Sequence, residues 1–301
     1  MKSVASVFIA LTSAWSAFAQ QQSDNDLLWK KLEARLVAAV DNFNGVMGVT
    51  ILDLTDGRAI LKNADRVFPT ASSIKIAILL ELYRQDQNGK AKLNDIYTFD
   101  SKDLVEDSQI MAGLTPNVTR VTNRDLAQFM IAVSDNAAAN ILMDRLGMQN
   151  VNAMLRSLGL TKTMLRRKMM DIAAAKRGDE NVSTPQEMAR LLEAIYKGKA
   201  LNKELTDSLM KQLRTLKKDS WLSTDLPKDV EVADKPGSLE GVRNDCGIIF
   251  AKNRPFAISV MTSSVRDEHG GERVISEIAL DAFRYFDMRG RTTEYGRVLE
   301  H

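Results

Sequence analysis

The sequence predicts an α/β protein in which helices flank one antiparallel β-sheet and an all-helical lobe is inserted between the strands. Runs with strand character occur only near the two ends of the chain, and about 150 residues of mostly helical pattern separate them. The 301 residues are 45% hydrophobic and 27% charged, which suits one compact unit of one or two lobes. We therefore expect both ends of the chain to contribute to a single sheet.

The first elements are a helix and a β-hairpin. The stretch "LLWKKLEARLVAAVDNF" has helical spacing, and Gly45 follows it. In "GVMGVTILDLTDGRAILKNA", two β-branched runs flank the turn "TDGR", a pattern that is typical of a hairpin.

Helical signals then dominate from Thr70 to about Tyr196, in "ASSIKIAILLELYRQ", "TNRDLAQFMIAVS", "NAAANILMDRLG", "VNAMLRSLG" and "TPQEMARLLEAIYKG". Strands return in "DVEVADKPGS", "RNDCGIIFA" and "FAISVMTSS", and "GGERVISEIALDAFRYFDM" is a final amphipathic helix. We assign residues 20–66 and 219–301 to an α/β lobe and residues 67–218 to the helical lobe. A functional site is expected in the cleft between the two lobes.

Residues 1–19 have the pattern of a cleavable secretory signal. A short basic start precedes the apolar run "VASVFIALTSAW", and Ala17-Phe18-Ala19 fits a small-x-small cleavage site. The alternative is a membrane anchor, which needs about 20 apolar residues. We expect a mature protein that begins at Gln20, has no membrane anchor, and is periplasmic or secreted.

The composition argues against several partners and cofactors. Lys plus Arg number 41 and Asp plus Glu 39, a net charge of +2 that predicts no nucleic-acid partner. The two histidines, His269 and His301, are too few for a histidine-rich metal site, so we expect no metal and no cofactor. His269 is also the sole internal candidate for a serine–histidine pair. Cys246 is the only cysteine, which excludes an internal disulfide.

The stretch "FPTASSIKIAILLELY", residues 68–83, places a lysine in the first turn of an apolar helix. Residues three apart share a helix face, so Ser72 and Lys75 should meet within hydrogen-bond reach. Ser72 would lie beside the free N–H groups of the helix start, which favour a developing anion. A partly buried lysine near other cations has a lowered pKa and can accept the serine proton. The pair therefore predicts a serine nucleophile with a lysine base.

Two companion motifs make this prediction specific. Ser-x-x-Lys alone is weak, since a chain of this length holds about one match by chance, and Ser208 with Lys211 is a second match that we interpret as helix surface. "SDN", residues 134–136, begins the segment "NAAAN", and "DKPGS", residues 234–238, lies in a predicted strand. The three motifs in this order are the signature set of class A β-lactamases and penicillin-binding proteins. From about residue 32 to about residue 288 the sequence resembles the class A β-lactamase family.

The resemblance implies a single β-lactamase-like catalytic domain and a role for each matching residue. Ser72 would attack the carbonyl of a β-lactam or of a D-alanyl peptide, and Lys75 would take its proton. Ser134 would pass a proton to the departing nitrogen, and Asn136 would bind the acyl amide of the substrate. Lys235 would attract the substrate carboxylate and hold Ser134 in place.

Three further assignments complete the implied site. The backbone N–H groups of Ser72 and Ser238 would form the oxyanion hole. Arg243 would supply a second cation for the substrate carboxylate. Asp135 would be structural.

The same motifs have structural explanations. Residues 134–136 could form a helix N-cap, and residues 235–237 could form a simple turn. Arg243 could pair with Glu240 or Asp245 at the surface.

The loop after the helical block departs from the family, whose members carry there a glutamate that activates the deacylating water. Counting back from Pro185 puts Lys168 at its place, and counting forward from Asn136 puts Met169 there. Neither side chain is a general base for water at neutral pH.

Other residues of this region also differ. Asp171 is the nearest carboxylate, and Asp179 and Glu180 lie further on. The asparagine that follows the family's glutamate is replaced by Ala173 or nearby apolar residues. Pro236 stands where most relatives have Thr or Ser, and proline offers neither a hydroxyl nor an N–H.

The sequence therefore predicts a serine hydrolase of the class A β-lactamase type that acts on β-lactams through an acyl-Ser72 intermediate. Loss of a general base typically costs about 10²–10⁴ in rate, so deacylation should be slow. The alternatives are a D-alanyl-D-alanine carboxypeptidase of the penicillin-binding type and a non-catalytic sensor of β-lactams or peptidoglycan. We expect a monomer.

Overall fold

The computed structural model describes residues 27–217, 220–293 and 295–299. The predicted signal sequence, residues 1–19, lies outside these ranges. Within them, no helix is both long enough and apolar enough to cross a membrane.

The central sheet has the strand order β2–β1–β9–β8–β7, and every neighbouring pair is antiparallel. Its strands are β1 (Val46–Asp53), β2 (Ala59–Lys62), β7 (Val232–Leu239), β8 (Val242–Ile249) and β9 (Phe256–Ser263). The predicted hairpin and the three late strands are confirmed. They join into one sheet because β1 pairs with β9 along its whole length, Val46 facing Ser263.

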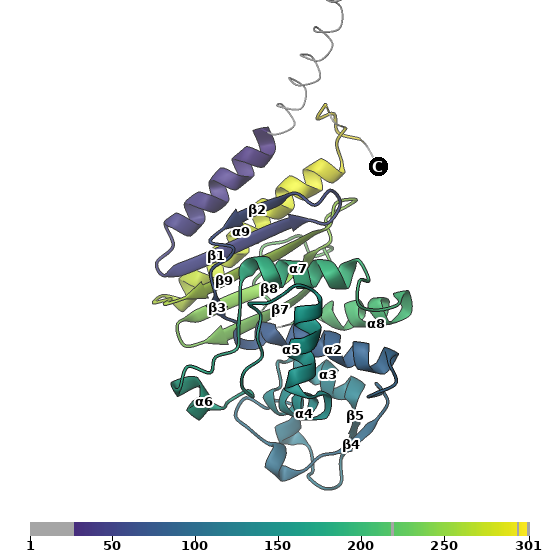
Figure 1. Cartoon of the computed structure of the whole chain (residues 1–301). Helices are drawn as coiled ribbons and strands as arrows, with labels where there is room; N and C mark the ends of the chain where they lie inside the picture. The colour runs from purple at the N-terminus through teal and green to yellow at the C-terminus, as the bar shows by residue number, and fades with distance from the viewer. Residues whose placement is uncertain (1–26, 218–219, 294, 300–301) are drawn as a thin grey trace, which may run out of the picture.

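Two helices from opposite ends of the chain cover one face of the sheet, as Figure 1 shows: a helix over residues 27–41 and α9 (Glu268–Gly290). Aromatic side chains fill the layer between them and the sheet. Trp29 meets Tyr285 edge-on with ring centroids 5.5 Å apart, and Phe286 stacks on Phe256 of β9 at 4.2 Å. Such pairs stabilise by about 0.5–1.5 kcal/mol beyond the apolar area that they bury.

Helix α7 (Pro185–Tyr196) packs on the opposite face, against β1 and β9. Its start follows local rules: the Thr184 hydroxyl accepts a hydrogen bond from the backbone N–H of Glu187, and Pro185 occupies the first turn, where no N–H is needed. The helix thus belongs spatially to the sheet, although it lies within the sequence range assigned to the helical lobe. The lobe boundaries themselves stay predictions.

The lobe below the sheet in Figure 1 is mainly helical. Its helices are η1 (Ala71–Ile74), α2 (Lys75–Gln87), η2 (Ser101–Asp103), η3 (Met111–Gly113), α3 (Asn123–Ala132), α4 (Asn136–Leu146), α5 (Met148–Ser157), α6 (Ile172–Lys176) and α8 (Lys203–Leu213). Two short sheets that the sequence did not predict lie among them: β3 (Phe68–Pro69) with β6 (Val182–Ser183), and β4 (Ile96–Thr98) with β5 (Arg120–Thr122).

Helix α2 lies at the centre of this lobe and is buried on nearly all sides, as expected for a helix that is apolar around its circumference. Glu81, a fully buried carboxylate on this helix, is paired with Arg84 at 2.6 Å and accepts a hydrogen bond from Gln85 at 2.7 Å. The preceding 3-10 turn, η1, packs against β7. The N-terminal end of α2 therefore lies where the lobe meets the edge of the sheet.

Candidate active site

The structure places Ser72 in η1 and Lys75 at the first position of α2, with the lysine fully buried. The ammonium of Lys75 donates to the carbonyl oxygen of Ser134 (2.6 Å), to the Ser134 hydroxyl (3.0 Å) and to Oδ1 of Asn136 (2.8 Å). The Ser134 hydroxyl in turn donates to Oγ of Ser72 at 2.9 Å. The link between Ser72 and Lys75 thus runs through Ser134.

This geometry differs from the direct contact expected from the sequence. That expectation assumed one continuous α-helix, whereas Ser72 lies in a 3-10 turn and α2 begins three residues later. The three donors of the ammonium are taken by acceptors on the neighbouring loop.

Burial lowers the pKa of Lys75 well below its ordinary value, and the nearby charge of Lys235 lowers it further. Desolvation penalises an ammonium, and a second cation opposes its protonation. Both effects favour the neutral amine, which is the form that can accept a proton. The hydrogen-bonded series Lys75–Ser134–Ser72 therefore connects a base to a nucleophile.

The loop between α3 and α4 presents Ser134 to the nucleophile. Asp135, fully buried, caps α4 by accepting from the N–H of Ala138 at 3.0 Å. Its other oxygen accepts from the N–H groups of Ile110 and Met111, at 2.8 and 2.9 Å. The N-cap interpretation of this motif holds for Asp135, and the flanking Ser134 and Asn136 face Lys75.

Strand β7 forms the opposite wall. Lys235 is 1% exposed and donates to the carbonyl of Pro236 at 2.9 Å, while Ser238 is exposed at the end of the strand. Gly237 lies so close to η1 that a Cβ there would stand 2.8 Å from the carbonyl oxygen of Thr70 and 2.9 Å from the N–H nitrogen of Ser72. Residues 235–237 are thus part of a strand and not a turn, and glycine is what allows the strand to approach the nucleophile.

A cavity of about 440 Å³ opens between these elements. Its wall includes Ser72, Ser134, Asn136 and Ser238, which the sequence predicted as site residues. Other wall residues were not predicted as site residues, and they are Ala71, Asp107, Gln109, Val133, Arg167, Met169, Met170, Ile172, Glu180, Asn181, Pro236 and Leu239. The site is therefore assembled from six separate segments of the chain.

Four of the wall residues are non-glycine residues in the left-handed region: Ala71 (φ 48°), Asp107 (57°), Ser134 (59°) and Met170 (61°). Such backbone conformations cost of order 1–3 kcal/mol each and persist only where the surrounding fold imposes them. Their concentration around one cavity marks it as a functional site, independently of the sequence motifs.

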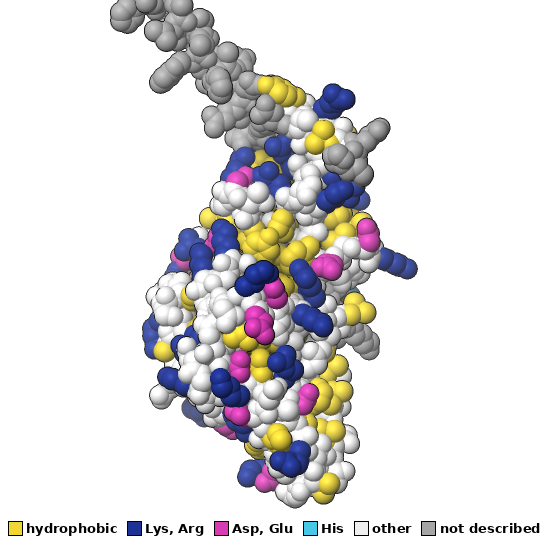
Figure 2. Space-filling model, turned by 90° about the vertical axis from the view of Figure 1, so that its right-hand side faces the viewer, with side chains coloured by type: hydrophobic (Ala, Val, Ile, Leu, Met, Phe, Trp, Pro, Cys, Tyr) yellow, Lys and Arg dark blue, Asp and Glu magenta, His cyan; other side chains and the backbone are white. Residues whose placement is uncertain are grey.

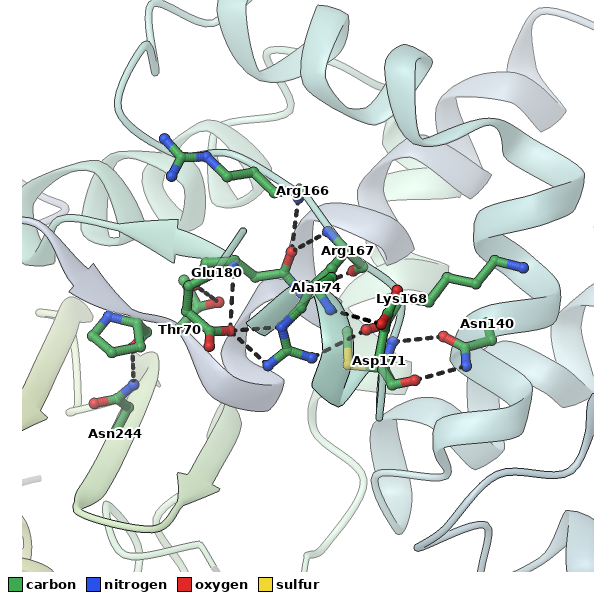
Figure 3. Close-up of polar contacts among 12 residues, drawn as sticks. Thr70, Asn140, Arg166, Arg167, Lys168, Asp171, Ala174, Glu180 and Asn244 are labelled. Carbon is green, nitrogen blue, oxygen red and sulfur yellow. Dashed lines mark hydrogen bonds and ion pairs between the residues drawn. The ribbon is translucent and has the colours of Figure 1, made fainter. Parts of the chain in front are cut away.

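The loop that precedes α7 closes the cavity, and Figure 3 shows its polar contacts. Arg167 pairs with Oε1 of Glu180 through Nε (2.9 Å) and Nη2 (2.6 Å). Asn140 of α4 holds Met169 by a reciprocal pair of hydrogen bonds to its backbone, at 2.8 and 3.1 Å. The two hydrogen bonds from Asn140 hold the main chain of Met169, a residue that lines the cavity.

The same loop shows which position faces the cavity. Lys168 is not among the wall residues, since its ammonium pairs with Asp144 at 2.7 Å, on exposed surface. Asp171 caps α6 by accepting from the N–H of Ala174 at 2.9 Å, and it does not line the cavity either. Of the two positions that align with the family's glutamate, the one that lines the cavity is therefore Met169, which is apolar.

Arg243 lies outside the cavity wall. Its guanidinium pairs with Glu268 and, at 3.0 Å, with Glu272, both on α9, and donates to two carbonyl groups of its own hairpin at 2.9 Å. The partners expected from the sequence, Glu240 and Asp245, are not the ones it uses. Its predicted contact with a substrate carboxylate stays a prediction that this geometry does not favour.

The remaining candidates lie elsewhere on the molecule. His269 is exposed on α9 and contacts Glu272 at 3.1 Å, and Ser208 contacts the Tyr83 hydroxyl at 3.1 Å from α8. Neither residue lines the cavity. Within the described parts of the chain, no group of three or more His, Cys, Asp or Glu side chains is arranged to hold a metal ion.

Comparison with known proteins decides the family. A sequence profile described as "Beta-lactamase enzyme family" matches residues 30–286. The chain belongs to this family. β-Lactamase SME-1 of Serratia marcescens is 29% identical over 94% of this chain and 95% of its own length, and an imipenem-hydrolyzing β-lactamase of Enterobacter cloacae is 30% identical over 80% and 85%.

Comparison with solved structures leads to the same family. The crystal structure of a β-lactamase from Sphaerobacter thermophilus superposes with a TM-score of 0.76 at 29% identity, covering 84% of this chain and 95% of that one. The predicted fold class and the resemblance to class A β-lactamases are confirmed. The chain is a serine hydrolase of the β-lactamase type.

Proposed function

We propose that this β-lactamase-family protein opens β-lactams by transferring their acyl group to Ser72. The observation that carries the proposal is the hydrogen-bonded series from buried Lys75 through Ser134 to Ser72. With Lys75 neutral, these hydrogen bonds would reverse, so that Ser72 donates to Ser134 and Ser134 donates to Lys75. The Ser72 proton would move to Lys75 along them, and Ser134 would then return a proton to the β-lactam nitrogen as the ring opens. A positioned acid or base of this kind typically contributes about 10²–10⁴ in rate.

The other predicted site residues have complementary roles in this proposal. The N–H groups of Ser72 and Ser238 would stabilise the oxyanion, a contribution of several kcal/mol in comparable sites. The Asn136 side chain, already oriented by Lys75 and by a 3.2 Å hydrogen bond to the carbonyl of Glu106, would bind the acyl amide. Lys235 would attract the substrate carboxylate.

Release of the acyl group should be slower than its formation. In this proposal acylation uses Ser72, Lys75 and Ser134, whereas Met169 stands in the wall at the place expected for the family's water-activating glutamate. The same feature favours the second candidate, a D-alanyl-D-alanine carboxypeptidase, because a linear acyl group leaves space for water that an opened β-lactam blocks. In the third candidate, a non-catalytic sensor, the acyl-enzyme would accumulate with either substrate.

Intact-protein mass spectrometry after mixing with benzylpenicillin tests the proposal, with Ser72→Ala as the control. We expect an adduct on the wild-type protein and none on the variant. Decay of the adduct with release of hydrolysed penicillin identifies a β-lactamase. A stoichiometric adduct that persists, together with D-alanine release from a peptide, identifies the peptidase. A wild-type protein that forms no adduct would contradict the Ser72 mechanism.

We also propose that the chain is exported and acts as a monomer. Export is supported by the signal-like pattern of residues 1–19. The mass of the mature protein, which should begin at Gln20, and its elution volume on a sizing column test these two points.

A further inference from the structure

One carboxylate in the cavity wall, Glu180, has no part in the acylation chemistry. An acyl-Ser72 ester is released only when water attacks its carbonyl carbon, and a general base must take a proton from that water. The question is which described side chain is placed to do so.

The backbone register brings the segment of Glu180 alongside the segment that carries the nucleophile. Strands β3 and β6 pair antiparallel with Phe68 facing Ser183, and the N–H of Thr70 continues the pairing to the carbonyl of Asn181 at 2.9 Å. The next position along this register sets Glu180 opposite Ala71, the residue that precedes Ser72. Both residues line the cavity.

The hydrogen bonds of this carboxylate leave one oxygen available. Oε1 of Glu180 accepts from Nε and Nη2 of Arg167, at 2.9 and 2.6 Å, and from the N–H of Asn181 at 3.2 Å. Within the described chain, all recorded hydrogen bonds of this carboxylate go to Oε1, and Oε2 receives none. The side chain is 26% exposed, so water from the cavity can reach it. The three hydrogen bonds to Oε1 fix the orientation of the Glu180 carboxylate and therefore the position of Oε2.

The competing carboxylates are less well placed. The Asp171 carboxylate caps α6 by accepting a hydrogen bond from the N–H of Ala174, and Asp171 does not line the cavity. Asp107 also lines the cavity, but it is exposed and lies in the loop whose carbonyl accepts from the N–H of Asn136 at 3.4 Å, where its charge acts on Lys75. Of the two carboxylates in the wall, Glu180 is the one whose chain neighbour, Asn181, accepts a backbone hydrogen bond from the segment that carries the nucleophile.

We propose that Glu180 is the general base that activates water for hydrolysis of the acyl-Ser72 ester, a proposal that rests on the function proposed above. Oε2 takes one proton of the water as its oxygen forms a bond to the acyl carbon. The bond between that carbon and Oγ of Ser72 then breaks, and the proton held by Glu180 returns to Oγ. Arg167 holds the carboxylate in place through its two hydrogen bonds to Oε1.

The test separates the two half-reactions of the full-length protein with benzylpenicillin, by following adduct formation and adduct decay in the mass spectrum. Glu180→Gln keeps an oxygen for Arg167 and removes the basic carboxylate. We expect adduct formation at the wild-type rate and decay slowed about 100-fold or more. Asp179→Asn is the matched control, since Asp179 is the neighbouring carboxylate, pairs with Arg177 at the surface and does not line the cavity. Its decay rate should equal that of the wild type.

A second variant distinguishes a base from a residue that only ties the loop. Glu180→Ala should deacylate slowly, and added formate should restore much of the rate by supplying a carboxylate in the vacated space. Loss of deacylation without rescue would assign Glu180 to loop structure and overturn the proposal. So would wild-type decay in Glu180→Gln, or a loss of decay in Asp107→Asn or Asp171→Asn alone. Failure of the wild type to form any adduct would instead overturn the proposed function.

Discussion

Asp135 provides a strong test of how the site is held. Its buried carboxylate accepts three backbone hydrogen bonds, from Ala138 at the start of α4 and from Ile110 and Met111 on the neighbouring loop. In Asp135→Ala the helix loses its cap, at about 1 kcal/mol, and two more N–H groups lose their acceptor, at about 1–3 kcal/mol each. We expect the free energy of unfolding to fall by about 4 kcal/mol, and for a chain of this size the unfolding midpoint by about 10 °C.

Urea denaturation followed by circular dichroism measures the first quantity, and calorimetry the second. Asp144→Ala is the control, because Asp144 is an exposed carboxylate on the same helix and its loss should change stability by less than about 0.5 kcal/mol. If Asp135→Ala were destabilised by less than about 1 kcal/mol, the assignment of a structural role from buried, charge-assisted hydrogen bonds would be wrong.

Three other substitutions test the site. Lys235→Met removes a cation that lowers the pKa of Lys75. That pKa should therefore rise, and the pH profile of Ser72 acylation should shift to higher pH. The shift should be partial, because burial is the larger cause of the lowered pKa and remains in the variant. An unshifted profile would exclude Lys75 as the base. Gly237→Ala should cost about 1–3 kcal/mol of stability, because the new Cβ meets backbone atoms. It should also slow acylation by about 100-fold by displacing the oxyanion donors. A mass-spectrometric time course of adduct formation measures the second effect. Arg243→Ala should lower the free energy of unfolding by about 2 kcal/mol and leave the acylation rate unchanged; a slower acylation would restore its predicted contact with the substrate.

The surface that is turned toward the viewer in Figure 2 carries a hydrophobic area among scattered charges. A shallow hollow lies between the β1–β2 hairpin and α7, with Leu52, Leu61 and Ala189 in its wall and Arg190 and Glu193 among the charged residues there. It shares no residue with the wall of the active-site cavity. Substitutions there should therefore act on stability rather than on catalysis.

The fold was predictable because its signals are local or pairwise. Alternating β-branched residues around "TDGR" specify a hairpin without help from the rest of the chain, and the apolar run after Lys75 specifies a buried helix. The site motifs were readable for a related reason. The chemistry limits which residue types can serve at each place, so Ser72, Ser134 and Lys235 stood out by type and order.

The parts that the sequence did not reveal depend on tertiary contacts. Arg243 pairs with α9, which begins 25 residues later and folds back on its strand, so no local window contains both partners. Arg167 and Glu180 close a loop of irregular structure, where no periodic pattern indicates which side chains meet. The charged residues that precede β6 indicate no partner without the register of β3.

The pairing of β1 with β9 has a consequence for how the molecule forms. Val46 meets Ser263, so the middle of the sheet cannot close until nearly the whole polypeptide has been synthesised. Contacts between such distant residues carry a large loop-closure entropy and slow the search for the native topology. The helical lobe, made of local contacts, can gain structure much earlier. The active-site cavity cannot form until β7 has joined the sheet, because β7 provides one of its walls. Acquisition of penicillin reactivity during refolding should therefore be a late event that reports the joining of the two ends of the chain.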